Sequence, residues 1–257
     1  MNFSIIKIPF DKCIVEKERR GAALAPNQIE KELNDFFQFE ALKTKTEFLE
    51  IKETNDFNKL HKEVEATALN EYKKGNLVAG LGGDHSVSYG LMKAFAKKFP
   101  RKSGLIYFDA HFDCQDDFLP PTHEDVLCAA VKEKFFAGQN ILVAGARNYT
   151  EKERAFVKKE DITFSQELRE HDVIAFCERF ENIYVSIDID ALDPAFAPGT
   201  GWPEPAGLHP RPLLNLLRLL KATNEVKGFD IVEVSPPKDV NNITVRLAAR
   251  ILLELIK

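Results

Sequence analysis

The sequence lacks the features that mark secreted, disulfide-stabilised and membrane-spanning proteins. It has four cysteines, Cys13, Cys114, Cys128 and Cys177, scattered without a close pair, so we expect free thiols in a reducing cytoplasm. No apolar run approaches the ~20 residues of a membrane span. Residues 1–10 show no charged segment followed by a long apolar one, as a signal peptide would. We therefore expect a cytoplasmic protein without a membrane partner.

The chain also lacks an excess of basic residues and any linker rich in glycine, serine or proline. Its 35 lysines and arginines are outnumbered by 40 aspartates and glutamates, which gives a net charge of −5. This balance argues against a nucleic-acid partner that needs a basic surface, and it mildly favours a cationic substrate. Because 44% of the 257 residues are hydrophobic, a sizeable core is expected. We expect one domain over residues 1–257.

What the sequence does contain is a nearly regular alternation of short apolar runs and amphipathic stretches. The runs expected to form strands are Phe3–Ile8, Thr46–Ile51, Leu77–Leu81, Leu105–Phe108, Ile141–Ala144, Ile183–Asp190 and Phe229–Val234. The stretches expected to form helices are Pro26–Phe37, Asn55–Lys74, Val87–Phe99, Val126–Lys134, Thr150–Lys159, Asp172–Phe180, Pro210–Lys221 and Thr244–Ile256. Continuous apolar strands are typical of a sheet covered by helices on both faces. The pattern therefore predicts a three-layer α/β/α sandwich with a mostly parallel central sheet.

Polar clusters follow three of these strands. They are Gly82-Gly83-Asp84-His85-Ser86, Asp109-Ala110-His111-Phe112-Asp113 and Ser186-Ile187-Asp188-Ile189-Asp190-Ala191-Leu192-Asp193-Pro194. In open α/β folds ligands bind beyond the carboxyl ends of the strands. We expect the three clusters to meet there, and we expect the Asp-x-His-x-Asp and Asp-x-Asp spacings to place their side chains on one face of an extended strand.

The clusters supply a set of six candidate metal ligands. These are His85, Asp109, His111, Asp113, Asp188 and Asp190. Four carboxylates and two imidazoles suit a hard to borderline divalent ion such as Mn²⁺. Six ligands exceed the needs of one ion that must also admit a substrate, so two ions roughly 3.5–4 Å apart, which together activate a water, fit better. Taken singly, each cluster is equally compatible with an ordinary turn residue or one structural metal.

These motifs resemble those of the ureohydrolase family, the arginases and agmatinases, and the match extends loosely from Ala22 to the C-terminus. The resemblance implies an arginase-like fold, a two-manganese hydrolase that releases urea from a guanidino compound, and a homotrimer or homohexamer. It implies that His85 and Asp113 bind one metal and that His111 and Asp190 bind the other. Asp109 and Asp188 would bridge the two, and Asp113 would also orient the nucleophile.

The resemblance assigns two further catalytic roles. Glu233, in Val232-Glu233-Val234-Ser235-Pro236, would hold the guanidinium, and His123 would pass a proton to the leaving amine. The chemistry is consistent with both. A carboxylate can bind a planar guanidinium through two hydrogen bonds, and an amine leaves readily only when it is protonated, which calls for a group such as histidine. An exposed loop histidine and a surface glutamate are the alternatives.

Departures from the family pattern concern the substrate. Trp202 stands where a small threonine is usual, and it would line the pocket. Asn148 is a candidate substrate-binding residue. The loop Gln115–Asp125 and the stretch Arg147-Asn148-Tyr149 lack the residues with which arginases hold an amino acid. We expect the acids of that loop, Asp116, Asp117, Glu124 and Asp125, to favour a cationic tail. Agmatine is therefore the first expectation; arginase, formiminoglutamase and guanidinobutyrase activities, or an inactive metal-binding regulatory homologue, are the alternatives. Arg147 is the one cation placed to help an acidic substrate.

Overall fold

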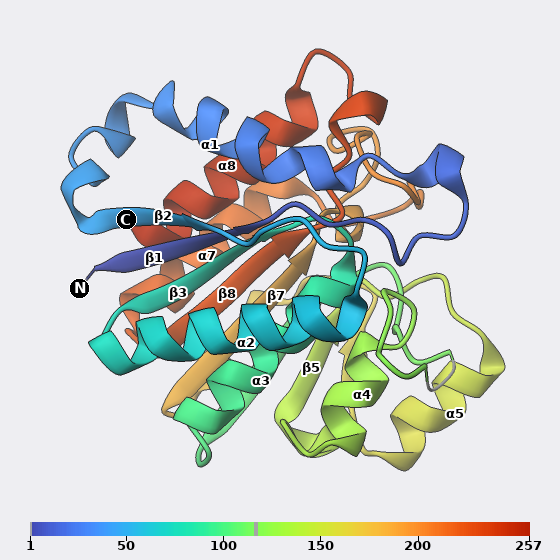
Figure 1. Cartoon of the computed structure of the whole chain (residues 1–257). Coiled ribbons are helices and arrows are strands. Elements are labelled where there is room, and N and C mark those ends of the chain that lie inside the picture. Colours follow the sequence, from blue (N-terminus) through green and yellow to red (C-terminus); the bar gives the residue numbers. More distant parts are fainter. Residues whose placement is uncertain (1, 116–117) are drawn as a thin grey trace.

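The computed structural model describes residues 2–115 and 118–257. Within these residues, eight strands form one sheet in the order β2-β1-β3-β8-β7-β4-β5-β6, and every pairing is parallel (Figure 1). The strands are β1 Phe3–Ile8, β2 Thr46–Glu50, β3 Leu77–Gly82, β4 Ser103–Phe108, β5 Ile141–Ala144, β6 Thr163–Ser165, β7 Asn182–Asp188 and β8 Val226–Val232. The mostly parallel sheet predicted from the apolar runs is thus confirmed.

Helices cover both faces of this sheet. They are α1 Ala25–Asn34, α2 Phe57–Lys74, α3 Ser88–Lys98, α4 Val126–Lys132, α5 Glu151–Lys159, α6 Glu170–Cys177, α7 Pro210–Ala222 and α8 Ile243–Ile256. Two separate apolar clusters fill the spaces between the layers: one takes residues from α1, α6, α7 and α8, and the other from α2, α3, α4 and α5. This is the three-layer sandwich expected from the sequence. No helix in the described residues is long and apolar enough to cross a membrane.

Local signals in the sequence set the helix ends. The Asp56 side chain accepts a hydrogen bond from the Lys59 N–H at the start of α2, and Gly75 ends that helix in the left-handed conformation, with φ of 87°. At the start of α5, Thr150 and Glu153 form a reciprocal capping box. Glu153 is nearly buried, so this cap fixes the chain that follows β5.

The structure departs from the expected elements in several places, of which three are the most informative. The short edge strand β6 was not predicted, because Thr163–Ser165 offers only one apolar residue. The helix beginning near Pro26 ends at Asn34, so Phe36 and Phe37 lie beyond it; Phe36 still packs against the core, whereas Phe37 is 98% exposed. The central strand ends at Asp188, and a 3-10 turn, Ile189–Ala191, follows it.

The sheet order brings four strand ends together. β3, β8, β7 and β4 are consecutive neighbours in the sheet, although β8 comes from the far end of the sequence. Because all strands run in the same direction, their carboxyl ends lie along one edge. The polar clusters that follow β3, β4 and β7 therefore lie beside the segment that follows β8, which begins with Glu233.

Candidate metal centre and pocket

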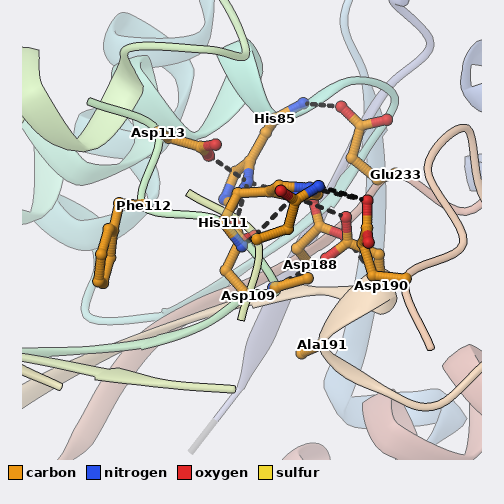
Figure 2. Close-up of polar contacts among 12 residues, drawn as sticks. His85, Asp109, His111, Phe112, Asp113, Asp188, Asp190, Ala191 and Glu233 are labelled. Carbon is orange, nitrogen blue, oxygen red and sulfur yellow. Dashed lines mark hydrogen bonds and ion pairs between the residues drawn. The ribbon is translucent and has the colours of Figure 1, made fainter. Parts of the chain in front are cut away.

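His85 lies at the centre of the first group of side chains (Figure 2). Its Nδ1 is 3.1 Å from Asp109 Oδ2, 3.1 Å from Asp113 Oδ2 and 3.3 Å from Asp188 Oδ2. One ring nitrogen can donate a proton to only one acceptor. Three carboxylate oxygens around one nitrogen are therefore better suited to share a cation than to share that proton.

The second group surrounds His111. Its Nδ1 is 3.1 Å from Asp190 Oδ2 and 3.4 Å from Asp109 Oδ1, and its Nε2 is 3.6 Å from Glu204 Oε1. Two sets of side chains have donor atoms close enough to hold one metal ion each: His85, Asp109 and Asp113, and Asp109, His111 and Asp190. Asp109 belongs to both sets, as a residue between two ions would.

The electrostatics of this cluster favour bound positive charge. Burial, followed by repulsion from Asp113 and Asp190, raises the pKa of Asp109 to about 6. Burial and the charges of Asp190 and Asp109 raise the pKa of Asp188 as well. Burial also acts on Asp190, but attraction by His111 outweighs it and lowers its pKa. Buried carboxylates that repel one another in this way are stabilised when cations lie between them, so the residues fit a metal site.

Buried side chains behind His85 fix its orientation. The Ser186 hydroxyl donates to Asp230 Oδ1 at 2.7 Å, so its oxygen is free to accept the Nε2 proton of His85 at 3.0 Å. The Tyr107 ring stacks on the imidazole with centroids 4.7 Å apart, and its hydroxyl donates to Asp113 Oδ2 at 2.5 Å. This arrangement leaves Nδ1 to face the three carboxylates. Sequence analysis missed Asp230 and Tyr107, since both lie inside strands and read as ordinary strand residues.

The candidate ligands converge through turns and not through strand alternation, which corrects the expected geometry. The Asp109 side chain accepts the His111 N–H at 2.6 Å, and the Asp188 side chain accepts the Asp190 N–H at 2.8 Å. In both places an aspartate caps the residue two positions later, so the two clusters share one local turn. Asp113 has φ of 48°, a left-handed conformation that non-glycine residues adopt only when their surroundings hold it.

Glu233 points toward the same space from the end of β8 (Figure 2). Its Oε1 accepts the backbone N–H of His85 at 2.8 Å. Among the described residues no hydrogen-bond partner reaches Oε2, although this oxygen is buried. Burial and the nearby Asp84 charge raise the pKa of Glu233 well above its usual value. Like Asp113, it has a positive φ, 60°. Such a carboxylate is ready to accept hydrogen bonds from a cationic ligand.

A cavity of about 230 Å³ opens above the two groups of candidate ligands. It is lined by His85, His111, Asp113, Gln115, His123, Glu124, Asn148, Tyr149, Thr150, Glu153, Asp188, Asp190, Trp202 and Glu233. The candidate substrate residues His123, Trp202, Asn148 and Glu233 are therefore together in one pocket. No lysine or arginine is among the lining residues in the described part of the chain, whereas several are acidic.

The loop before α4 explains why His123 lies in the pocket. Asp125 accepts hydrogen bonds from the Phe118 N–H, the Thr122 N–H and the Thr122 hydroxyl, which closes the loop. His61 of α2 lies 3.2 Å from the Pro121 carbonyl through Nε2 and ties the loop to the body of the protein. The His123 side chain is buried, so the alternative of an exposed loop histidine is wrong. Burial lowers the pKa of His123 to about 4.

Other residues expected at the pocket mouth have different places. Asp125 is fully buried and serves the loop, so it does not face the pocket. Asp116 and Asp117 lie outside the described residues. Glu124 lines the cavity as expected.

Arg147 is not available to a ligand. Its guanidinium donates to the carbonyls of Gly145, Asp190, Ala191, Glu204 and Pro205, at 2.6–3.3 Å. It therefore joins the Asp190 turn to the loop after Trp202. Contrary to the expectation from the sequence, Arg147 is not placed to bind the carboxylate of an acidic substrate. Asn148 lines the cavity, but its side chain donates to Glu204 Oε1 at 2.7 Å.

Proteins with similar sequences include an agmatinase and an arginase. The chain is 34% identical over 204 residues to an agmatinase of Escherichia coli O9:H4 (strain HS), covering 78% of this chain and 66% of that protein. It is 35% identical over 183 residues to the mitochondrial arginase 1 of Arabidopsis thaliana, covering 68% of this chain and 53% of that protein. The matched region thus spans about two thirds of the length of the agmatinase and about half of the length of the arginase.

Solved structures agree in fold. The agmatine ureohydrolase of Thermoplasma volcanium superposes with a TM-score of 0.87 at 27% identity, covering 99% of this chain and 88% of that one. An arginase from Bacillus subtilis superposes with a TM-score of 0.89 at 22% identity, covering 100% and 98%, which shows the fold alone. The family model for arginases matches residues 1–257. The chain belongs to the arginase family.

Proposed function

We propose that this chain is a binuclear manganese hydrolase that cleaves a guanidino substrate to urea and an amine, with agmatine, which yields putrescine, as the preferred substrate. The observation that carries the proposal is Glu233, which lines an acid-rich pocket beside the ligand cluster and has a buried Oε2 without a hydrogen-bond partner among the described residues. A guanidinium presents parallel N–H groups that a carboxylate accepts through two hydrogen bonds. The names of the agmatinase relatives support the same class of substrate.

The composition of the pocket favours agmatine over arginine. Arginine carries an α-carboxylate whose charge a basic residue would neutralise, and the described lining residues include no lysine or arginine. Arg147 is committed to backbone carbonyls. The same absence disfavours guanidinobutyrate and formiminoglutamate, which also carry carboxylates. The charge of Glu124, which lines the cavity, would instead attract the free amine of agmatine.

The six ligands would divide between two ions. His85 and Asp113 would hold one, His111 and Asp190 the other, and Asp109 and Asp188 would lie between them. Two divalent ions so held supply a nucleophilic water near neutral pH. The protein's own part is to bind the guanidinium at Glu233, to orient it over the ligand cluster, and to move a proton toward the amine that leaves.

His123 is the proposed proton carrier. Because burial lowers its pKa to about 4, its imidazole is neutral at pH 7 in the free protein. A neutral imidazole can accept a proton at one nitrogen before the leaving amine takes one up, so it acts as a relay and does not begin as a charged acid. Its buried Nδ1, which has no partner among the described residues, is available for this transfer.

His123→Ala is expected to lower kcat by about 10²-fold, the lower end of the ~10²–10⁴-fold range for proton-transfer catalysis, because water can replace part of the relay. Metal content should stay unchanged, and added imidazole should restore part of kcat. Steady-state kinetics and elemental analysis measure both effects. His171→Ala, at an exposed position, is the control. A His123→Ala protein with full activity at every pH would remove His123 from the mechanism.

The proposal itself is tested by urea release after reconstitution with manganese. Agmatine, arginine, guanidinobutyrate and formiminoglutamate are compared at equal concentration, with formamide measured for the last. We expect the largest kcat/KM for agmatine and about two manganese ions per chain by elemental analysis. Preference for arginine would change the substrate, and full activity with one tightly bound ion would exclude the two-metal site. A metal-loaded protein without turnover would support the inactive regulatory homologue.

A further inference from the structure

Trp202, the single tryptophan of the chain, contacts the side chains of Arg19 and His123. The guanidinium carbon of Arg19 is 5.0 Å from the centroid of its indole ring, and the centroid of the His123 ring is 5.1 Å away. Arg19 also donates to the Gly201 carbonyl at 2.9 Å, so it holds both the ring and the backbone just before it. Contacts thus run from Arg19 in the N-terminal segment through Trp202 to His123 in the pocket, with the His123 and Trp202 rings tilted by 32°.

The segment that carries Arg19, residues 11–24, is fixed to the rest of the protein. Asp11 Oδ2 accepts the N–H groups of Gly21 and Ala23, at 2.9 and 3.3 Å. Gly21 has φ of 146°, and a side chain there would collide with Ser235. Lys238 donates to the Glu18 carbonyl at 2.6 Å. Arg19 is therefore presented to Trp202 from a defined backbone and not from a free tail.

We propose that Arg19 is a positioning residue that holds Trp202 as a wall of the pocket, and that this wall keeps His123 over the ligand cluster and restricts entry to slender, unbranched guanidino compounds. The proposal rests on the function proposed above and identifies the residues that determine its substrate specificity. Aromatic rings attract a guanidinium over their faces and pack favourably against other rings. Because both contacts involve the same indole, loss of Arg19 leaves Trp202 with only one of these two contacts, the one to His123.

The position of Trp202 also bears on the shape of the pocket. Trp202 is half-buried and lines the cavity together with Asn148 and Thr150, and it lies on the loop that Arg147 anchors. An α-carbon with two substituents, as in arginine, needs more width at the cavity wall than the methylene chain of agmatine does. A bulky ring held rigidly at this position therefore discriminates by shape, in addition to the charge of the lining residues.

The test uses the full-length, manganese-loaded protein and the variants Arg19→Met, Arg19→Lys and Arg20→Met. Arg20 is the matched control: it is half-buried, adjacent in sequence, and donates through Nε to the Ile14 carbonyl at 2.8 Å instead of stacking on the indole. Arg19→Met should shift the emission of Trp202 to longer wavelength and increase its quenching by acrylamide. Since there is one tryptophan, the signal reports this ring alone.

Activity provides the second readout. Arg19→Met should lower kcat for agmatine by roughly two- to fivefold, the factor expected for one exposed cation–π contact, with little change in KM. Arg19→Lys should recover part of kcat, and Arg20→Met should match the parent in both readouts. Trp202→Thr should raise the arginine-to-agmatine ratio of kcat/KM. Unchanged fluorescence in Arg19→Met, or equal changes in Arg20→Met, would overturn the proposal.

The two proposals fail in different ways. If the parent protein hydrolyses no guanidino compound, the proposed function fails, whereas the fluorescence comparison still decides whether Arg19 holds Trp202. If the parent is active and Trp202→Thr leaves the substrate ratio unchanged, the proposed function stands and the specificity role of the wall is rejected.

Discussion

Asp188→Ala should remove nearly all urea release and lower the manganese content well below that of the parent. Asp188 Oδ2 is 3.3 Å from His85 Nδ1, and its Oδ1 caps the turn that carries Asp190. The substitution therefore removes one candidate ligand and loosens a second. Changes to outer-shell partners of metal ligands typically cost ~10–100-fold in affinity or activity, and we expect a larger loss here. Elemental analysis and urea assays measure the two effects.

Asp193→Ala is the matched control for this experiment. Asp193 lies five positions later and accepts the N–H groups of Ala195 and Gly207 at 2.9 and 3.0 Å, so it organises a turn. These hydrogen bonds lower its pKa. We expect the variant to keep its metal and to unfold at a lower temperature. An Asp188→Ala protein that retains both ions and normal turnover would show that the assignment of the ligands is wrong.

Glu233→Gln should raise KM and lower kcat together. The substitution keeps the size of the side chain and removes the charge that would pair with the guanidinium. Truncating one partner of a buried, hydrogen-bonded charge pair costs ~2–5 kcal/mol, or roughly 30- to 5,000-fold in kcat/KM. The hydrogen bond from the His85 N–H to Oε1 can persist with an amide oxygen, so the metal content should be unchanged. Steady-state kinetics with agmatine gives both constants.

Glu254→Gln is the control for the loss of a buried glutamate. Glu254 of α8 is also buried, but it pairs with Arg218 and Arg250, at 2.8 and 2.5 Å, and is absent from the pocket lining. We expect it to lower the unfolding midpoint without changing KM. Equal kinetic effects from Glu254→Gln and Glu233→Gln would mean that general destabilisation, and not substrate binding, explains the result.

The sequence was most informative where an element is a continuous apolar run bounded by clear turns. Phe3–Ile8 and Ile141–Ala144 were predicted with their observed bounds, because covered strands have continuous apolar runs. β6 is the opposite case: it has three residues at the sheet edge and no periodicity to detect. Phe37 was misassigned because its spacing matches a helical face, whereas the chain leaves the helix before reaching it.

At the site, residue types and motifs predicted which side chains lie close together, but not the backbone geometry and strand order that bring them there. The sequence indicates that Asp109, Asp188 and Glu233 follow strands, yet only the strand order brings Glu233 to the His85 backbone. The turns capped by Asp109 and Asp188 replace the expected strand alternation. Arg147 was expected to face a ligand. An arginine in a sequence gives no sign that five carbonyls will surround its guanidinium, since four of those carbonyls come from segments distant in sequence.

The insertion of β8 between β3 and β7 has a consequence for biosynthesis. β3 ends at Gly82 and pairs with a strand that begins at Val226, so most of the chain leaves the ribosome before this pairing can form. Until then β3 and β7 each present an unpaired edge, and the cluster of aspartates has no Glu233 beside it. Pairings of such high sequence separation form slowly. Before β8 is synthesised, the unpaired edges of β3 and β7 therefore lie next to a group of aspartates whose charges are not neutralised. Metal bound by these aspartates at that stage would bind before the sheet is complete.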